Sequence, residues 1–167
     1  LDDGMRKQRG LMCLASVDDY LGDRIKKHEK TRREKEEDRV DHIDRLNAQT
    51  GPIFLTYRNK PAIAELIAKG TADAPELEFT TDDGITHRVW TLSDRAVVDG
   101  LMAAFKEQEA LYIADGHHRS ASAVRVAKKR REQFGPRDDA TEYNYFMAIL
   151  YPADQLHVYD YKRGVTD

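Results

Sequence analysis

The amino-acid sequence predicts an α/β (α+β) domain in which a mixed β-sheet is flanked by helices. Short apolar runs of strand length alternate along the chain with segments whose apolar residues recur at helical spacing. The alternation does not keep a strict strand–helix–strand period, which favours a mixed sheet over a purely parallel one. Of the 167 residues, 40% are hydrophobic and 34% are charged, a composition that supplies one core beneath a heavily charged surface.

The N-terminal third predicts a strand, a highly charged helix and a second strand. Residues 9–17, RGLMCLASV, form an apolar run of strand length that a polar segment ends. Residues 31–34, TRRE, have the spacing of a capping box, which predicts a helix that begins at Arg32. Gly51-Pro52 is expected to end that helix, and PIFLTY reads as a buried strand directly after it.

The middle of the chain predicts a helix, a hairpin and another helix. Residues 61–70, PAIAELIAKG, have helical spacing and end in glycine. Residues 76–92 alternate apolar and polar side chains on both sides of Asp83-Gly84, which is typical of a β-hairpin turn. Ser93 is the expected N-cap of the helix that follows.

The C-terminal third predicts a strand that turns directly into a long helix. The strand is ALYIA, the turn is Asp115-Gly116, and the helix covers residues 117–133. A second apolar strand is expected over 142–151, EYNYFMAILY, and a further strand or strand edge over 156–165.

Length, charge and cysteine content limit the function classes. The length suits a single domain over residues 1–167, and a chain that begins with leucine is expected to be a piece of a longer protein. The formal net charge is −3, so duplex DNA is not an expected partner. No apolar run reaches the roughly 18 residues of a membrane span. Cys13 is the single cysteine, which excludes a disulfide within the chain and favours a cytoplasmic protein. The oligomeric state stays open.

The turn between ALYIA and the long helix has the residues of an anion site. A helix start offers unpaired backbone N–H groups and partial positive charge, and Gly116 removes a side chain that would block a phosphate. Arg119 offers a forked pair of donors and His118 adds another. Asp115 is suited to cap the helix, orient a histidine or hold a cation beside a phosphate. The alternative is an ordinary solvated helix start.

Metal and triad chemistry fit these residues less well. His117 and His118 are adjacent, and neighbours on a helix point about 100° apart, so they do not converge on one zinc ion. The usual i, i+4 histidine spacing is absent because residue 122 is serine. The sequence also lacks the nucleophile-elbow pattern that a serine triad would need.

Through the DGHHR element after an apolar strand, the chain resembles the bacterial and archaeal family called domain of unknown function 1015. Three segments carry the resemblance: VDDYLGDRIKKHEKTRREKEEDR at 17–39, GPIFLTY at 51–57 and LYIADGHHRSASA at 111–123. A looser one is EYNYFMAILYPADQLHVYDYKR at 142–163. Because members of that family are longer, the resemblance implies that this chain is a central fragment.

A more distant resemblance is to the ParB/sulfiredoxin-like domains, which implies a core of that type. Those domains hold nucleotide phosphates with a Gly-x-x-Arg motif at a strand–helix junction, and free-serine kinases among them use a similar element. Only Asp115, Gly116, His118 and Arg119 match the motif. Sulfiredoxin chemistry does not transfer, because its cysteine would fall at His117.

A second polar cluster, KHEKTRREKEEDR, precedes and begins the charged helix. Glu29 is a candidate general base and His28 its neighbour, and the resemblance includes both residues. We therefore expect this loop to fold over the DGHHR element, with His28 contributing to cofactor binding. The alternative is a charged helix start without a function.

The first functional hypothesis is a nucleotide- or phosphate-dependent transferase, of the free-serine-kinase type, that uses ATP or ADP and Mg²⁺. Gly116, His118 and Arg119 would bind phosphate, and Asp115 would place Mg²⁺ or act as the base, with Glu29 as the alternative base. The second is a ParB-like nucleotide-sensing module without turnover. The third is a phosphate-ester hydrolase that uses one of the two adjacent histidines as a catalytic residue.

Overall fold

Five strands of this mixed α/β protein form one sheet in the order β1-β7-β3-β6-β2. The computed structural model describes residues 4, 6–135 and 140–158. Pairs β1–β7 and β3–β6 are antiparallel, while β3–β7 and β2–β6 are parallel, so the predicted mixed sheet is confirmed. The strands are β1 (Leu11–Ser16), β2 (Ile25–Lys26), β3 (Ile53–Tyr57), β6 (Leu111–Asp115) and β7 (Tyr145–Pro152).

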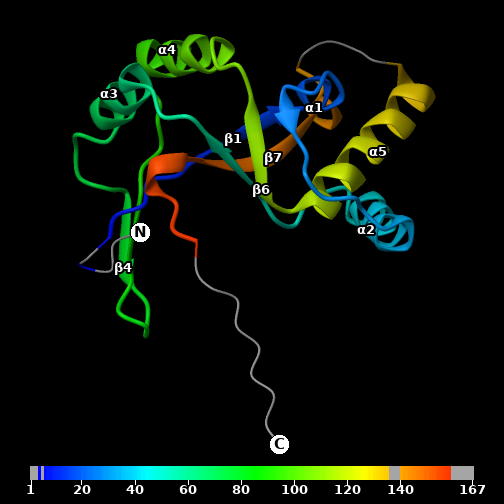
Figure 1. The fold of residues 1–167 in the computed structure, drawn as a ribbon, viewed down its shortest axis with the longest axis horizontal. Helices are drawn as coiled ribbons and strands as arrows, with labels where there is room; N and C mark the ends of the chain where they lie inside the picture. The colour runs from blue at the N-terminus through cyan, green and yellow to red at the C-terminus, as the bar shows by residue number, and fades with distance from the viewer. Residues whose placement is uncertain (1–3, 5, 136–139, 159–167) are drawn as a thin grey trace, which may run out of the picture.

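The helices gather at the two ends of this sheet (Figure 1). Helices α3 and α4 lie against each other at one end, and α2 packs on α5 at the other, near α1. Their bounds are α1 (Val17–Leu21), α2 (Arg33–Leu46), α3 (Pro61–Gly70), α4 (Arg95–Lys106) and α5 (His117–Phe134). A separate two-stranded sheet, β4 (Leu77–Thr80) with β5 (Thr86–Val89), is the predicted hairpin, and Gly84 at its turn has a φ of 80°.

The core lies on one face of the five-stranded sheet. Side chains along β3 and β7 alternate between buried and half-buried, which is the period of two expected for strands that bury one face. Leu55, Ile113 and Phe146 are at most 1% exposed on this face. On β1, Met12 and Leu14 are 60% and 64% exposed, so helices cover the opposite face incompletely.

The charged helix differs from its predicted bounds. It begins at Arg33, and its N-cap Arg32 makes no side-chain cap. The predicted capping box does not form, because Thr31 Oγ1 donates to the carboxylate of Glu36 instead of capping the helix. The helix also ends before Gly51-Pro52, because Asn47 adopts the left-handed conformation with a φ of 51°.

The ends of two helices and of one expected strand also differ from the predictions. Val17 starts α1 rather than ending β1, because Ser16 Oγ accepts a hydrogen bond from the Asp18 backbone N–H and caps the helix. Asp94, not Ser93, caps α4, because its carboxylate accepts hydrogen bonds from the backbone N–H groups of Ala96 and Val97. The strand expected over 156–165 extends past the described residues, and those of its residues that are described, 156–158, have no strand structure.

Arg131 ties the end of α5 to α1 and leads to a prediction about acid stability. Its guanidinium donates to both carboxylate oxygens of Asp18, at 2.7 and 3.0 Å, and these hydrogen bonds lower the pKa of Asp18. A carboxyl group whose pKa is lower in the folded state stabilises the fold above its unfolded pKa, near 4, and loses that contribution as pH falls further. Because Asp18 is 68% exposed, solvent keeps the contribution below about 1 kcal/mol.

We therefore expect Asp18→Asn to lower the free energy of urea unfolding at pH 7 and to have little effect near pH 2. Asp82→Asn, at an exposed position in the hairpin, is the matched control and should be neutral at both values. An Asp18→Asn effect of equal size at both pH values would contradict the ion-pair explanation.

Candidate functional site: the β6–α5 junction and the loop after β2

The β6–α5 junction turns on a single glycine. Gly116 is the N-cap of α5 and has φ 96° and ψ 29°, a left-handed conformation that side chains with a Cβ rarely adopt. No side chain caps the helix, so Asp115 is not the N-cap that the sequence allowed. The first N–H groups of α5, from His117 to Arg119, therefore point out of the helix start without a side-chain cap.

Arg119 folds back over this glycine. A Cβ placed on Gly116 would come within 3.1 Å of both Nε and Nη2 of Arg119. The same Nη2 donates to Asp115 Oδ2 at 2.5 Å, and Nη1 lies 3.2 Å from the position of a Cβ on Gly51. Two glycines thus make room for the guanidinium, where the sequence predicted that Gly116 made room for a phosphate. The result is a cation held at the positive end of a helix.

His117 lies beneath the loop that follows β2. Its side chain is 3% exposed, and its Nδ1 lies 3.4 Å from Glu29 Oε2, a carboxylate whose side chain is 59% exposed. The His28 ring meets the His117 ring edge to face, with centroids 4.3 Å apart. The backbone N–H of His28 also points to His117 Nε2 at a long 3.5 Å. His28, Glu29 and His117, which we call the His–Glu–His cluster, thus come from two distant segments.

The pairing of β2 with β6 brings these segments together. The two strands are parallel, with Ile25 opposite Leu111 and Lys26 opposite Tyr112. The chain therefore leaves both strands at the same edge of the sheet, and the loop after β2 passes over the start of α5. His118 fixes the loop at a second point, because its Nε2 accepts a hydrogen bond from the Arg32 backbone N–H at 3.2 Å. The structure thus places this loop over DGHHR, as the sequence analysis expected.

The hydrogen bond from the Arg32 backbone N–H limits the donors that the His118 ring can offer to a ligand. With Nε2 used as an acceptor, the neutral ring keeps its proton on Nδ1 and has only that nitrogen as a donor. His117 and His118 do point to different partners, so they do not form a site with each other. The partner of His117 is the non-adjacent His28.

Small buried residues on α5 pack against α2 and support the site. Ser120 and Ser122 are fully buried, and Ser122 Oγ lies within 3.2 Å of the Glu36 carbonyl oxygen on α2. This packing fixes α2, and with it the loop that carries the His–Glu–His cluster. Gly51 and Glu36 support the site, although the sequence analysis assigned a functional role to neither. Both lie in segments that carry the family resemblance, Glu36 in residues 17–39 and Gly51 in GPIFLTY, but no local pattern indicates their contacts with α5.

The electrostatic surroundings favour a neutral His117. Burial is the main cause that lowers its pKa. The nearby His28 lowers the pKa further, while Glu29 and Asp115 oppose the shift. A neutral imidazole keeps a lone pair that can accept a proton or bind a metal ion. Cys13 is a poor nucleophile, because burial raises the pKa of its thiol to about 11.

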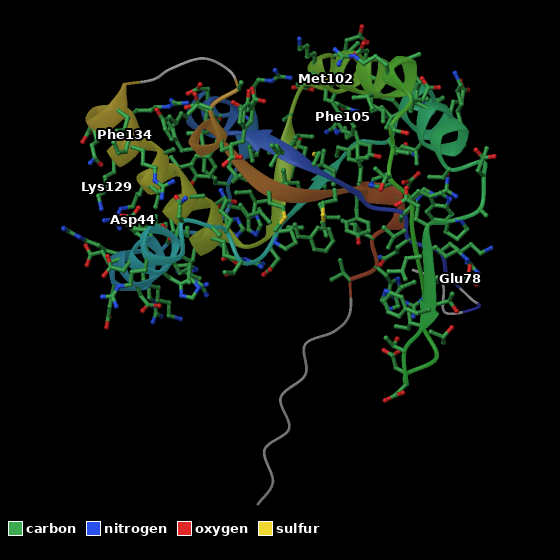
Figure 2. The ribbon with its side chains drawn as sticks, turned by 180° about the vertical axis from the view of Figure 1, so that it is seen from behind. Asp44, Glu78, Met102, Phe105, Lys129 and Phe134 are labelled. Atoms are coloured by element: carbon green, nitrogen blue, oxygen red, sulfur yellow. The ribbon has the colours of Figure 1, made fainter. Side chains whose placement is uncertain are left out.

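A hollow of about 470 Å³ lies at the other end of α5, away from the junction. Figure 2 labels three of its lining residues, Asp44, Lys129 and Phe134. Lys129 Nζ donates to the carboxylate of Asp44 there, and Arg130 Nη2 lies 3.5 Å from the same carboxylate. Its cations are thus already matched by an acidic partner, and none of the predicted site residues lines it.

None of the helices in the described part of the chain is long and apolar enough to cross a membrane.

Comparison with known proteins places the chain in a family. No curated protein and no solved structure matches it significantly. The ParB/sulfiredoxin-like core therefore stays a prediction. The model of the family described as "Protein of unknown function (DUF1015)" matches residues 1–167. Because this match spans the whole sequence, the chain belongs to the DUF1015 family.

Proposed function

We propose that the β6–α5 junction binds the phosphate of a nucleotide and that the protein is a small-molecule phosphotransferase of the free-serine-kinase type. One observation carries the proposal: the Arg119 guanidinium lies over Gly116, beside a helix start that has no side-chain cap. An anion at this point meets backbone N–H groups, the positive end of α5 and a forked cation together.

The Asp115–Arg119 ion pair gives the site two states. Asp115 is 71% exposed and Arg119 34%, so both side chains can exchange partners with a ligand. When a phosphate takes the guanidinium, Asp115 is released beside it. A carboxylate oxygen is a ligand that Mg²⁺ accepts, and Mg²⁺ usually bridges one or two carboxylates and the substrate phosphates. Asp115 therefore fits the role of holding Mg²⁺ next to ATP or ADP.

Glu29 is the better placed of the two candidate bases. Asp115 is paired with Arg119 at 2.5 Å and, once a phosphate releases it, is assigned to Mg²⁺, while Glu29 faces His117 and solvent. In this assignment His117 positions Glu29, and His118 and His28 border the phosphate site. The substrate is a hydroxyl compound such as free serine, and a cytoplasmic location supplies both the nucleotide and the substrate.

Nucleotide binding is tested by thermal unfolding with Mg²⁺ and ATP, ADP or CTP. A ligand at 100 times its Kd stabilises the folded state by about 2.7 kcal/mol, which raises the Tm of a domain of this size by roughly 5–10 °C. We expect ATP or ADP to give this shift, and inorganic phosphate a smaller one. The absence of a shift with every nucleotide would contradict the proposal.

Turnover is tested by the formation of phosphoserine, together with ADP from ATP or AMP from ADP, on addition of free serine. We expect Glu29→Gln to keep nucleotide binding and to lose at least about 100-fold in turnover, the scale of a general base. A wild-type protein that binds nucleotide without turnover would instead favour the nucleotide-sensing module. Release of phosphate from a phosphate ester without a nucleotide would favour the hydrolase.

A further inference from the structure

We propose that His28, Glu29 and His117 bind a divalent transition-metal ion, of the class of Zn²⁺ or Co²⁺. One ligand atom from each of these three side chains lies within 4.8 Å of the other two. Two imidazoles and a carboxylate are the donor set that such ions prefer, and Mg²⁺ does not. Metal binding here does not depend on the proposed phosphotransferase activity.

The distances suit a tetrahedral ion after a small movement. Zinc bonds to nitrogen and oxygen of about 2.0–2.2 Å set neighbouring donor atoms of a tetrahedral site about 3.3–3.6 Å apart. His117 Nδ1 and Glu29 Oε2 are already 3.4 Å apart. His28 lies on an exposed loop with its ring against His117, so its side chain can rotate to complete the set. The loop already lies close enough to α5 that an ion can bind without a rearrangement of the fold.

The three side chains divide into one rigid and two adjustable ligands. His117 stands at the start of α5, buried and fixed by the helix, and its neutral form is favoured. Binding through Nδ1 moves its ring proton to Nε2 and gives up the long contact from the His28 backbone N–H. His28 and Glu29 are exposed and adjacent in a loop without regular structure, which allows both to face one ion. Three protein ligands leave a fourth position for water, the arrangement of a catalytic rather than a structural zinc site.

This site does not use the adjacent pair of histidines, which the sequence analysis already found unsuited to binding one metal ion together. The adjacent His117 and His118 diverge, since His118 is held by the Arg32 backbone N–H. The converging pair is His28 with His117, which only the fold brings together. If the phosphotransferase proposal holds as well, a metal-bound water would take over the proton-accepting role from the Glu29 carboxylate, since zinc-bound water has a pKa near 7.

The test is a titration of the metal-free protein, without a histidine tag, with Zn²⁺ by calorimetry and with Co²⁺ by visible absorption. We expect one ion per chain and a Co²⁺ spectrum of four-coordinate type. His28→Ala and Glu29→Gln, both exposed positions, should each weaken Zn²⁺ binding by at least about tenfold. Because His117 is buried, its variant His117→Gln is used only after circular dichroism confirms that it folds.

His42→Ala is the matched control, because His42 is exposed on α2 and outside the cluster. It should bind Zn²⁺ as the wild type does. The proposal is overturned if wild type and His28→Ala bind Zn²⁺ equally, or if His42→Ala loses as much affinity as His28→Ala. Nucleotide binding in the same variants is read separately by thermal shift, so failure of the metal site and failure of the phosphate site give different results.

Discussion

Replacing Arg119 by alanine is expected to lower the affinity for ATP or ADP by at least about 100-fold and to leave the domain folded. Hydrogen bonds to a charged group contribute about 1.5–3 kcal/mol each, and the guanidinium can donate two to a phosphate. The cost to stability is small by comparison, because the Asp115–Arg119 pair is partly exposed and such pairs contribute about 0–1 kcal/mol. Nucleotide titration by calorimetry and urea unfolding measure the two effects.

Two further variants distinguish the contribution of the forked guanidinium donors from that of positive charge alone. Lys128→Ala removes a positive charge from an exposed position on the same helix and should leave nucleotide affinity within about twofold. Arg119→Lys keeps the charge but loses the forked donors, so its affinity should fall between wild type and Arg119→Ala. If Arg119→Ala binds nucleotide as tightly as Lys128→Ala does, the helix start is not the phosphate site.

The strand–glycine–helix junction could be predicted because its signals are local. An apolar run, Asp115-Gly116 and a long segment of helix formers define the end of β6 and the start of α5 within a few residues. The glycine at the N-cap follows from the left-handed backbone there. The same local argument correctly placed α3 and the β4–β5 hairpin.

The family resemblance led to the expectation that the loop covers DGHHR, but the contacts themselves could not be predicted, because they join distant segments. Strand β2 has two residues, too few for a strand pattern, yet its pairing with β6 brings Glu29 to His117. The capping box at Thr31 failed for a related reason, since Thr31 bonds Glu36 instead. The Arg32 N–H, meanwhile, is taken by His118. Tertiary partners overrode the local preference at the residues that build the site.

Gly116 has two separable roles, and Gly116→Ala is expected to disturb both. The left-handed backbone at a φ of 96° costs an alanine about 1–2 kcal/mol. The new Cβ would also lie 3.1 Å from the Arg119 guanidinium, closer than ordinary van der Waals contact, so the guanidinium would have to move away from the helix start by a few tenths of an ångström. We therefore expect a Tm lower by roughly 2–8 °C and, in addition, a loss of nucleotide affinity of at least about tenfold.

Gly135→Ala supplies the matched control at the other end of the same helix. Gly135 has a φ of 85° and nothing within 4 Å of the position of a Cβ, so the substitution strains the backbone without touching a side chain. Its ψ of 166° lies in a region that is essentially restricted to glycine, so its Tm should fall by at least as much, while nucleotide affinity stays within about twofold of wild type. Because both variants strain a backbone of positive φ and only Gly116→Ala contacts Arg119, the difference in affinity between them measures what the position of Arg119 contributes to phosphate binding. Equal affinities would show that the guanidinium does not need to lie over the glycine.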